Sequence, residues 1–316
     1  MPKISICIPA YNEAKNIPAA VDAVDELFRS ALKDCSSEII ITDNASTDDT
    51  WNVIQKIAQS KPHVRGYRFS RNFGYQNSIF AGLSLATGDA VVEMDADLED
   101  PPTVIAEFVK KWKEGFEVVY GVRAKRHAPW FMKIFFFLFY RILNAISDMR
   151  IPADSGDFRL LDRKVVDVLK SLPERNLYLR GLVSYLGFKQ VGVVYHRQPR
   201  LSGQSKFRFW NYVVLAIDAL TAFSKTPLRL IGILGGMIFG LSSLLAIYYI
   251  AGSVRDGRPV PGFTTLVVIT LMMNSITFIF LGILGEYLSR VFDDSKFRPR
   301  VIISESTVGK EFPKFF

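Results

Sequence analysis

Cysteine is almost absent from this chain, which has only Cys7 and Cys35 among its 316 residues. Two cysteines cannot form the disulfide framework of a small secreted protein, so a reduced compartment is the simpler interpretation. The apolar run in MPKISICIPA is too short for a secretory signal peptide. Apolar residues make up 49% and charged residues 22% of the chain, which excludes disorder, collagen and a simple coiled coil.

Charge is missing from two long stretches near the C-terminus. No charged residue lies between Arg229 and Arg255, and a second uncharged stretch follows soon after. Helices at about 230–251 and 263–285 would each be long enough to cross a hydrocarbon core of roughly 30 Å. The short, turn-rich connection GSVRDGRPVPG joins the two stretches. We therefore predict a two-helix transmembrane hairpin, with two buried core helices as the alternative.

Basic residues flank this predicted hairpin on both sides, whereas its connecting loop carries few. By the positive-inside rule both termini then face the cytoplasm. The expected organisation is a cytoplasmic domain over 1–225, the hairpin over 226–290 and a cytoplasmic tail over 291–316. The flanking residues are Lys206, Arg208, Lys225 and Arg229 before the hairpin, and Arg290, Lys296, Arg298 and Arg300 after it.

The net charge of +8 fits nucleic acid, anionic lipid or a phosphorylated substrate as a partner. The basic residues cluster beside the predicted membrane segments, which argues against nucleic acid. Aromatic-rich segments near 130–147 and 207–224 have cationic ends, a pattern typical of helices that lie in the membrane interface. Ordinary core helices are the alternative for both segments.

Strand and helix patterns alternate through the first hundred residues. Continuous apolar strands between helices predict a mostly parallel sheet covered by helices on both faces, a Rossmann-like α/β class. Ligands bind such sheets beyond the carboxyl ends of the strands. The expected strands are 3–10, 38–44, 63–69 and 89–96, and the expected helices are 14–34, 48–60, 74–86 and one that starts at Pro101 with Asp100 as its N-cap.

A further short strand is expected at 300–305, in the tail after the hairpin. Because an isolated strand is marginal and needs an edge to pair with, we predict that it pairs with a neighbouring subunit and that the protein is a homo-oligomer. Pairing with its own domain is the simpler alternative.

Polar clusters follow each of these early strands. Asp95 and Asp97 could converge on Mg²⁺ or Mn²⁺ together with phosphate oxygens, and a solvated turn is the alternative. Asp43 and Asn44 could hydrogen-bond a base or ribose, and Tyr11 could stack on a base. Local turns and helix starts are the alternatives for these three residues.

The motifs IPAYNE, TDNASTDDT, SRNFGYQNSIFAGL and MDADLEDPP occur in this order within residues 4–102. Together they resemble the inverting nucleotide-sugar glycosyltransferases with a GT-A fold. The later strings YGVR, DSGDFRLLDR and RLSGQSKFRFW are similar to the branch that glycosylates polyprenyl phosphate. That branch includes dolichyl-phosphate mannose synthase and the bactoprenol glucosyltransferases, whose C-terminal hairpin is the most similar.

The resemblance implies roles for individual residues. Asp157 matches a proposed catalytic carboxylate, Asp95 would face the sugar nucleotide, and Asp97 would hold the divalent metal with Asp95. The donor-binding residues implied are Pro9, Tyr11, Glu13, Asp43, Asn44, Arg71 and Asp95, and the acceptor-phosphate residues implied are Arg123, Arg200, Ser205 and Lys206. A polybasic patch for anionic lipid headgroups is the alternative for the last group.

The expected function is transfer of a hexose, glucose, from a UDP-sugar to polyprenyl (undecaprenyl) phosphate with inversion. The resemblance places such an enzyme in the bacterial inner membrane, with its catalytic domain in the cytoplasm. Transfer of mannose, N-acetylglucosamine or an aminoarabinose derivative is the nearest alternative. A non-catalytic, lipid-carrier-binding subunit is the alternative from another class.

Overall fold

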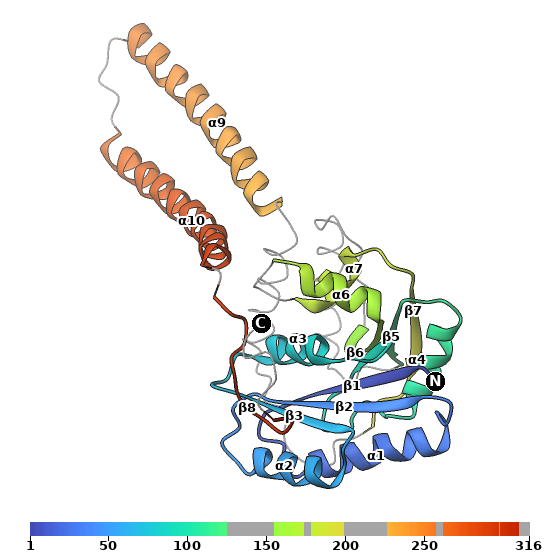
Figure 1. Cartoon of the computed structure of the whole chain (residues 1–316). Helices are drawn as coiled ribbons and strands as arrows, with labels where there is room; N and C mark the ends of the chain where they lie inside the picture. Colours follow the sequence, from blue (N-terminus) through green and yellow to red (C-terminus); the bar gives the residue numbers. More distant parts are fainter. Residues whose placement is uncertain (125–154, 174–177, 199–225, 257–261, 297, 310–316) are drawn as a thin grey trace.

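The computed structural model describes residues 1–124, 155–173, 178–198, 226–256, 262–296 and 298–309. Within these residues, a sheet covered by helices forms one unit, and two long helices, α9 and α10, extend away from it (Figure 1). The strands are β1 (Lys3–Ala10), β2 (Ser36–Asp43), β3 (Val64–Phe69), β4 (Ala90–Glu93), β5 (Val118–Arg123), β6 (Ser155–Asp162), β7 (Gln190–Tyr195) and β8 (Ile303–Ser306). The helices are α1 (Ile17–Ser30), α2 (Thr50–Ser60), α3 (Tyr75–Leu85), α4 (Val104–Lys113), α6 (Arg163–Ser171), α7 (Leu179–Tyr185), α9 (Thr226–Asp256) and α10 (Phe263–Ser295).

The eight strands form one sheet in the order β7-β5-β6-β4-β1-β2-β3-β8. β1 pairs in parallel with β2 and β4, and β2 pairs in parallel with β3. β6 runs antiparallel to both of its neighbours, β4 and β5. The start of β6 therefore lies at the same edge as the carboxyl end of β4. The predicted α/β class and the early βα alternation are confirmed, while the antiparallel pairs of β6 and β8 make the sheet mixed rather than mostly parallel.

Alternation along the central strands divides the core into two layers. Ile39 and Ile41 of β2 pack with α1, α2 and α4 on one face of the sheet. Ile40, between them, packs with α3, α6 and α7 on the other face. Strands that are apolar on both faces are what a sheet covered on both sides requires. Figure 1 shows α1 and α2 below the sheet and α3, α6 and α7 above it.

The C-terminal strand β8 corrects one expectation. It pairs antiparallel with β3 of the same chain, with Arg68 opposite Glu305. The side chains of Val301 and Ile303 are buried in the core layer of α3. Pairing with a neighbouring subunit was therefore the wrong expectation, because β3 leaves an edge open within the chain itself. The pairing of β8 therefore no longer supports a homo-oligomer, which stays a prediction.

The start of α4 corrects a second expectation. The helix begins at Val104 with Thr103 as its N-cap, and Asp100 does not cap it. Asp100 is instead buried, and its Oδ1 accepts a hydrogen bond of 2.6 Å from the hydroxyl of Tyr195. β4 is also shorter than predicted, since it ends at Glu93. Asp95 and Asp97 consequently lie in the turn beyond the strand.

α9 runs away from the sheet and α10 runs back toward it, both on the same side of the sheet (Figure 1). Among the described residues, one segment is long and apolar enough to cross a membrane, Met272–Ser295 within α10. The apolar run of α9, Ile231–Leu244, is shorter. The structure thus gives two long helices, while the crossing of a membrane by both stays a prediction. The predicted interfacial helices near 130–147 and 207–224 lie outside the described residues.

Candidate functional site at the carboxyl edge of the sheet

Three of the loops at this edge contain a residue other than glycine in the left-handed region of the backbone. These are Asn12 after β1, Ala45 after β2 and Leu98 after β4, with φ values of 58°, 56° and 56°. Such conformations are uncommon outside glycine and cost energy, so the surrounding structure must hold them in place. Three of them at one edge indicate tight turns that are kept for a purpose other than stability.

The loops after β1 and β2 are locked together by hydrogen bonds. The amide of Asn12 donates to Ser46 Oγ at 2.9 Å, and the amide of Thr47 donates to Asn12 Oδ1 at 2.8 Å. The amide of Glu13 donates to Thr50 Oγ1 at 2.9 Å. This lock fixes the loop that carries Tyr11, whose side chain is exposed beside it.

Pro9 and Glu13, the other residues near this loop that were predicted to bind the sugar nucleotide, are less exposed than Tyr11. Pro9 is buried within β1, where it pairs with Thr42 of β2. Glu13 accepts a hydrogen bond of 2.6 Å from Asn16 Nδ2, so its carboxylate helps to close the start of α1. Pro9 is thus part of the buried strand, whereas Glu13 is partly exposed at the start of α1.

Asp43 lies at the end of β2 and is 0% exposed. Its Oδ1 accepts a hydrogen bond of 3.0 Å from the amide of Ser46. Its Oδ2 is 3.4 Å from Arg68 Nε but accepts no hydrogen bond within the part of the chain that the structure describes. Burial raises the pKa of this carboxyl. A buried carboxylate oxygen without a donor is rare in native proteins and points to a ligand that supplies one.

Asn44 and Arg71 have other neighbours. The Asn44 side chain donates to Asn72 Oδ1 at 3.1 Å and accepts from the amide of Phe73 at 2.8 Å. It therefore holds the loop between β3 and α3. The exposed Arg71 guanidinium stacks on the Phe73 ring, with 4.3 Å from Cζ to the ring centroid. The contacts of Asn44 and Arg71 are thus with their own loop, and their predicted binding of the sugar nucleotide stays a prediction.

The Asp95 carboxylate lies where β4 has turned away from the sheet. Its Oδ1 accepts a hydrogen bond of 2.7 Å from the hydroxyl of Tyr75, the first residue of α3. Burial, opposed by this bond, combines with the charges of Asp97 and Asp100 to raise the pKa of Asp95 to about 7. Asp97 Oδ1 accepts from the amide of Glu99 at 3.1 Å. Acidic groups thus gather at this turn.

These groups fit a hard divalent cation only in part. Carboxylate oxygens are the ligands that Mg²⁺ and Mn²⁺ prefer. In the described ranges, no group of three acidic, histidine or cysteine side chains is arranged to hold a metal. Two carboxylates alone would leave most positions of such an ion to other oxygen ligands such as water, as is common for Mg²⁺.

Asp157 lies near the start of β6, which the antiparallel pairing brings to the same edge. Arg180 of α7 binds it through two parallel hydrogen bonds, Nε to Oδ1 and Nη2 to Oδ2, both 2.7 Å. Arg159 adds a contact of 3.3 Å to Oδ1. Burial would raise the pKa of Asp157, but Arg180 and Arg159 outweigh it and lower the pKa to about 2. The group is ionised at neutral pH and is a weak proton acceptor.

Sequence reasoning missed several residues of this site. The buried Glu93 of β4 lies 3.7 Å from Arg159 Nε, and burial raises its pKa well above the usual range. A charged residue within the apolar strand VVEMDAD was a usable signal for Glu93. Arg159, Arg180 and Tyr75 gave none, because only the fold brings them to the aspartates.

Arg123, predicted for the acceptor phosphate, lies at the end of β5. A Cβ atom at Gly156 would come within 3.1 Å of Arg123 Nη2, so the guanidinium packs against Gly156, the residue before Asp157. Its charge helps to lower the pKa of Asp157. It also lies 3.7 Å from Asp100 Oδ2 and donates to the Tyr195 hydroxyl at 3.4 Å. The other predicted acceptor residues, Arg200, Ser205 and Lys206, lie outside the described residues.

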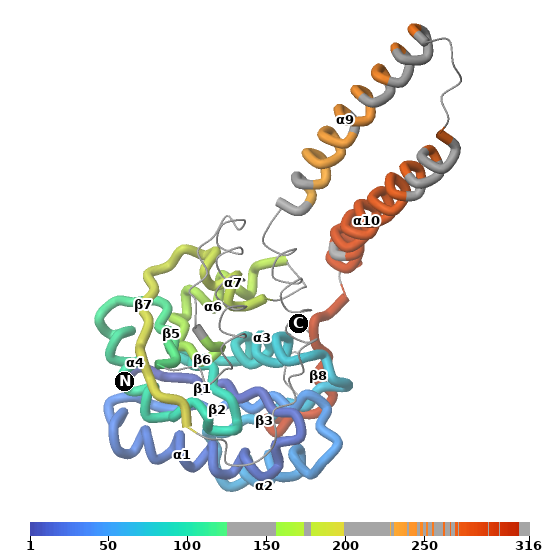
Figure 2. Tube along the Cα trace, turned by 180° about the vertical axis from the view of Figure 1, so that it is seen from behind, coloured from blue at the N-terminus to red at the C-terminus, as the bar shows by residue number. Residues whose placement is uncertain are grey.

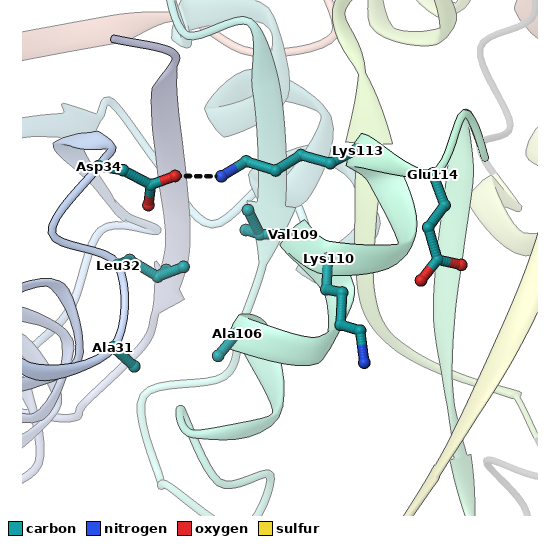
Figure 3. A pocket seen from close by; sticks show the side chains of 8 residues that line it. All are labelled: Ala31, Leu32, Asp34, Ala106, Val109, Lys110, Lys113 and Glu114. Atoms are coloured by element: carbon teal, nitrogen blue, oxygen red, sulfur yellow. Dashed lines mark hydrogen bonds and ion pairs between the residues drawn. The ribbon is translucent and has the colours of Figure 1, made fainter.

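A separate hollow of about 460 Å³ lies between the end of α1 and α4 (Figure 3). Lys113 and Asp34 face one another across it and form an ion pair. These residues precede β5 and β2, and none of the predicted site residues lines the hollow. It is therefore distinct from the site at the carboxyl edge.

Residues 5–169 match Glycosyl transferase family 2, and this chain belongs to that family. It is 38% identical to the bactoprenol glucosyl transferase of Shigella phage SfV, over 95% of this chain and 98% of that protein. It is 39% identical to the uncharacterized glycosyltransferase YkcC of Bacillus subtilis (strain 168), over 96% and 93% of the two chains. The resemblance drawn from the motifs is thereby confirmed, and the chain is a glycosyltransferase.

Among solved structures, glucosyl-3-phosphoglycerate synthase from Mycobacterium tuberculosis, in complex with Mn²⁺, UDP and phosphoglyceric acid, is similar to this chain. Its TM-score is 0.49 and its sequence identity is 20%, over 70% of this chain and 76% of that chain.

Proposed function

We propose that this enzyme transfers glucose from UDP-glucose to polyprenyl phosphate, with inversion, on the cytoplasmic face of a bacterial inner membrane. The observation that carries the proposal is the similarity, over nearly the whole length, to a bactoprenol glucosyl transferase. The carboxyl edge of the sheet supplies side chains suited to each part of such a reaction.

The donor would lie against the loops after β1, β2 and β4. Asp43 Oδ2 is available to accept a hydrogen bond from the nucleotide, and the exposed Tyr11 ring can stack on the base. Asp95 and Asp97 would lie beside the diphosphate. A divalent ion, Mg²⁺ or Mn²⁺, held by these two carboxylates would neutralise the charge that develops on the departing UDP.

In the transfer step, an oxygen of the acceptor phosphate forms a bond to the anomeric carbon while the bond from that carbon to UDP breaks. The acceptor is already an anion near neutral pH, so a strong base is not required. Asp157, ionised and held by Arg180, suits orientation of the acceptor better than removal of a proton. Arg123, which packs against Gly156 next to Asp157, is suited to the acceptor phosphate, together with Arg200, Ser205 and Lys206.

The long C-terminal helices support a membrane location. Large apolar side chains such as Leu241, Leu244 and Phe278 are exposed along α9 and α10. Long helices with this many exposed apolar side chains are more stable in a lipid bilayer than in water. We propose that both helices cross the bilayer, that residues 1–225 and 291–316 lie in the cytoplasm, and that the acceptor reaches the site from the adjacent leaflet.

The reaction is tested with the full-length protein in detergent, Mn²⁺, undecaprenyl phosphate and a panel of nucleotide sugars. We expect UDP release and a glucosylated lipid from UDP-glucose. Transfer only from GDP-mannose or from another UDP-sugar would replace the proposed donor. Binding of the lipid phosphate without release of any nucleotide would instead favour a non-catalytic lipid-carrier-binding subunit.

Topology is tested separately in whole cells. A Gly257→Cys variant should react with a membrane-impermeant maleimide, whereas a Ser304→Cys variant should react only after the membrane is opened. Cys7 and Cys35 are both buried and should contribute little background. Labelling of the second variant in intact cells would reverse the proposed orientation.

A further inference from the structure

The tail that follows α10 reaches the donor side of the site through Glu305. In the antiparallel register of β8 and β3, Glu305 lies opposite Arg68. Its Oε1 accepts a hydrogen bond of 3.2 Å from Arg68 Nη1, and its Oε2 accepts one of 2.9 Å from Trp51 Nε1. Two donors from separate elements, β3 and α2, therefore fix a carboxylate that the chain supplies only after its C-terminal helices.

Arg68 continues this contact inward to the buried carboxylate of Asp43. Its Nε lies 3.4 Å from Asp43 Oδ2, and its Nη2 donates to the carbonyl oxygen of Ser46 at 3.4 Å. Ser46 is also the residue whose amide binds Asp43 Oδ1. A guanidinium is planar and presents its donors in a fixed fork, so holding one arm orients the others. Glu305 thus holds Nη1 of the Arg68 guanidinium, while Nε of the same group lies next to Asp43.

The tail is anchored well enough to act in this way. The Arg300 guanidinium stacks over Phe80 at 4.3 Å and donates to the carbonyl of Leu172 at 2.6 Å. The amide of Ser70 donates to the carbonyl of Ile302 at 2.9 Å. Figure 2 shows the tail running from the end of α10 to the edge of the sheet beside β3. Glu305 thus belongs to a built part of the sheet rather than to a loose end.

We infer that Arg68 and Glu305 are positioning residues for recognition of the nucleotide by Asp43, so that donor affinity depends on the tail beyond α10. This inference rests on the proposed function, because it takes Asp43 as part of the donor pocket. Without Glu305, the half-exposed Arg68 side chain can turn toward solvent. Asp43 would then be a buried carboxylate without its nearest positive charge, which weakens the order of the pocket.

The test measures UDP binding by calorimetry and the kinetics of transfer, both with the full-length protein. In Glu305→Gln, which preserves the size of the side chain, the dissociation constant for UDP and the KM for the donor should rise by about three- to fivefold. The kcat should stay within about twofold, because the reacting atoms are elsewhere. Arg68→Gln should have at least the same effect, and the double variant should be no worse than Arg68→Gln alone.

Trp51→Phe is the matched control, because it removes the other hydrogen bond of Glu305 and leaves the contact between Arg68 and Asp43 in place. It should leave UDP affinity within about twofold of the wild type. Equal loss of thermal stability in Trp51→Phe and Glu305→Gln, with unchanged UDP affinity in both, would overturn the inference and leave a purely structural contact. Arg68→Lys, which retains the charge but loses the fork, provides a second measurement if Arg68→Gln does not fold.

Asp43→Asn separates this inference from the proposed function. Unchanged UDP affinity in Asp43→Asn would remove Asp43 from the donor pocket, and the proposed donor site would fail together with the inference. Weakened UDP binding in Asp43→Asn with normal binding in both Glu305→Gln and Arg68→Gln would retain the donor site and reject the inference alone.

Discussion

Asp95 and Asp157 lie at the same edge of the sheet and have opposite surroundings. Asp95 accepts a hydrogen bond from Tyr75, has other carboxylates as neighbours, and has a pKa raised to about 7. Asp157 is clasped by Arg180, and its pKa is lowered to about 2. The fold supplies the positive charge for one aspartate and withholds it from the other. A turn built in this way suits binding of a cation from outside, while Asp157 is already fixed by the protein.

The largest effect is expected on the uncompensated side. Asp97→Ala should reduce transfer by about a thousandfold or more, because a metal contributes several kcal/mol to neutralising a leaving diphosphate. The variant should also lose the rise in melting temperature that Mn²⁺ and UDP together give the wild type. Full activity of Asp97→Ala in excess EDTA would contradict the metal role and remove half of the comparison.

The compensated side is broken by Arg180→Ala. Loss of the two charge-assisted hydrogen bonds should lower kcat by about ten- to a hundredfold while the KM for UDP-glucose changes little. Arg180→Lys keeps the charge without the two-point contact and should fall between the variant and the wild type. Arg29→Ala, in an exposed pair with Glu26, is the matched control and should leave the kinetics unchanged. If the KM for UDP-glucose in Arg180→Ala rose as much as kcat fell, Asp157 would be assigned to donor binding instead.

The acceptor residues of the proposal sharpen the comparison from outside the two aspartates. Lys206→Ala and Arg200→Ala should slow transfer to lipid phosphate by about ten- to a hundredfold and leave UDP affinity nearly intact. Lys225→Ala, another basic residue of the same part of the sequence, tests general attraction to anionic lipid. Similar slowing in all three variants would favour a polybasic patch over a phosphate site.

Acid stability gives the smallest effect. Because the pKa of Asp157 is lower in the folded protein than the value of about 3.9 in an unfolded chain, its carboxylate stabilises the fold fully above that value. The contribution, about 2 kcal/mol, disappears as the pH falls toward 2. Asp157→Asn should therefore melt several degrees below the wild type at pH 7, and the difference should shrink below pH 4. A constant difference between pH 7 and pH 3 would show that the ion pair is not its source.

Features encoded by neighbouring residues were predictable from the sequence, and features encoded by distant ones were not. β1 occupies the predicted residues 3–10, because its apolar run is continuous and ends at a polar cluster. Asp95 and Asp97 were visible for the same local reason. The clasp of Asp157 by Arg180 depends on how α7 packs, which no local pattern encodes. The partner of β8 likewise depends on which sheet edge is open.

The connection between α10 and β8 limits how far the candidate site can lie from the membrane. It consists of residues 296–302, and even a fully extended chain of that length covers only roughly 25 Å. With α10 in the bilayer, as proposed, the sheet edge that carries Glu305 stays within this distance of the end of the helix. The site is therefore held at a nearly fixed distance from the membrane surface. A phosphate at headgroup level is within its reach, whereas the growing end of a long lipid-linked glycan is carried beyond it.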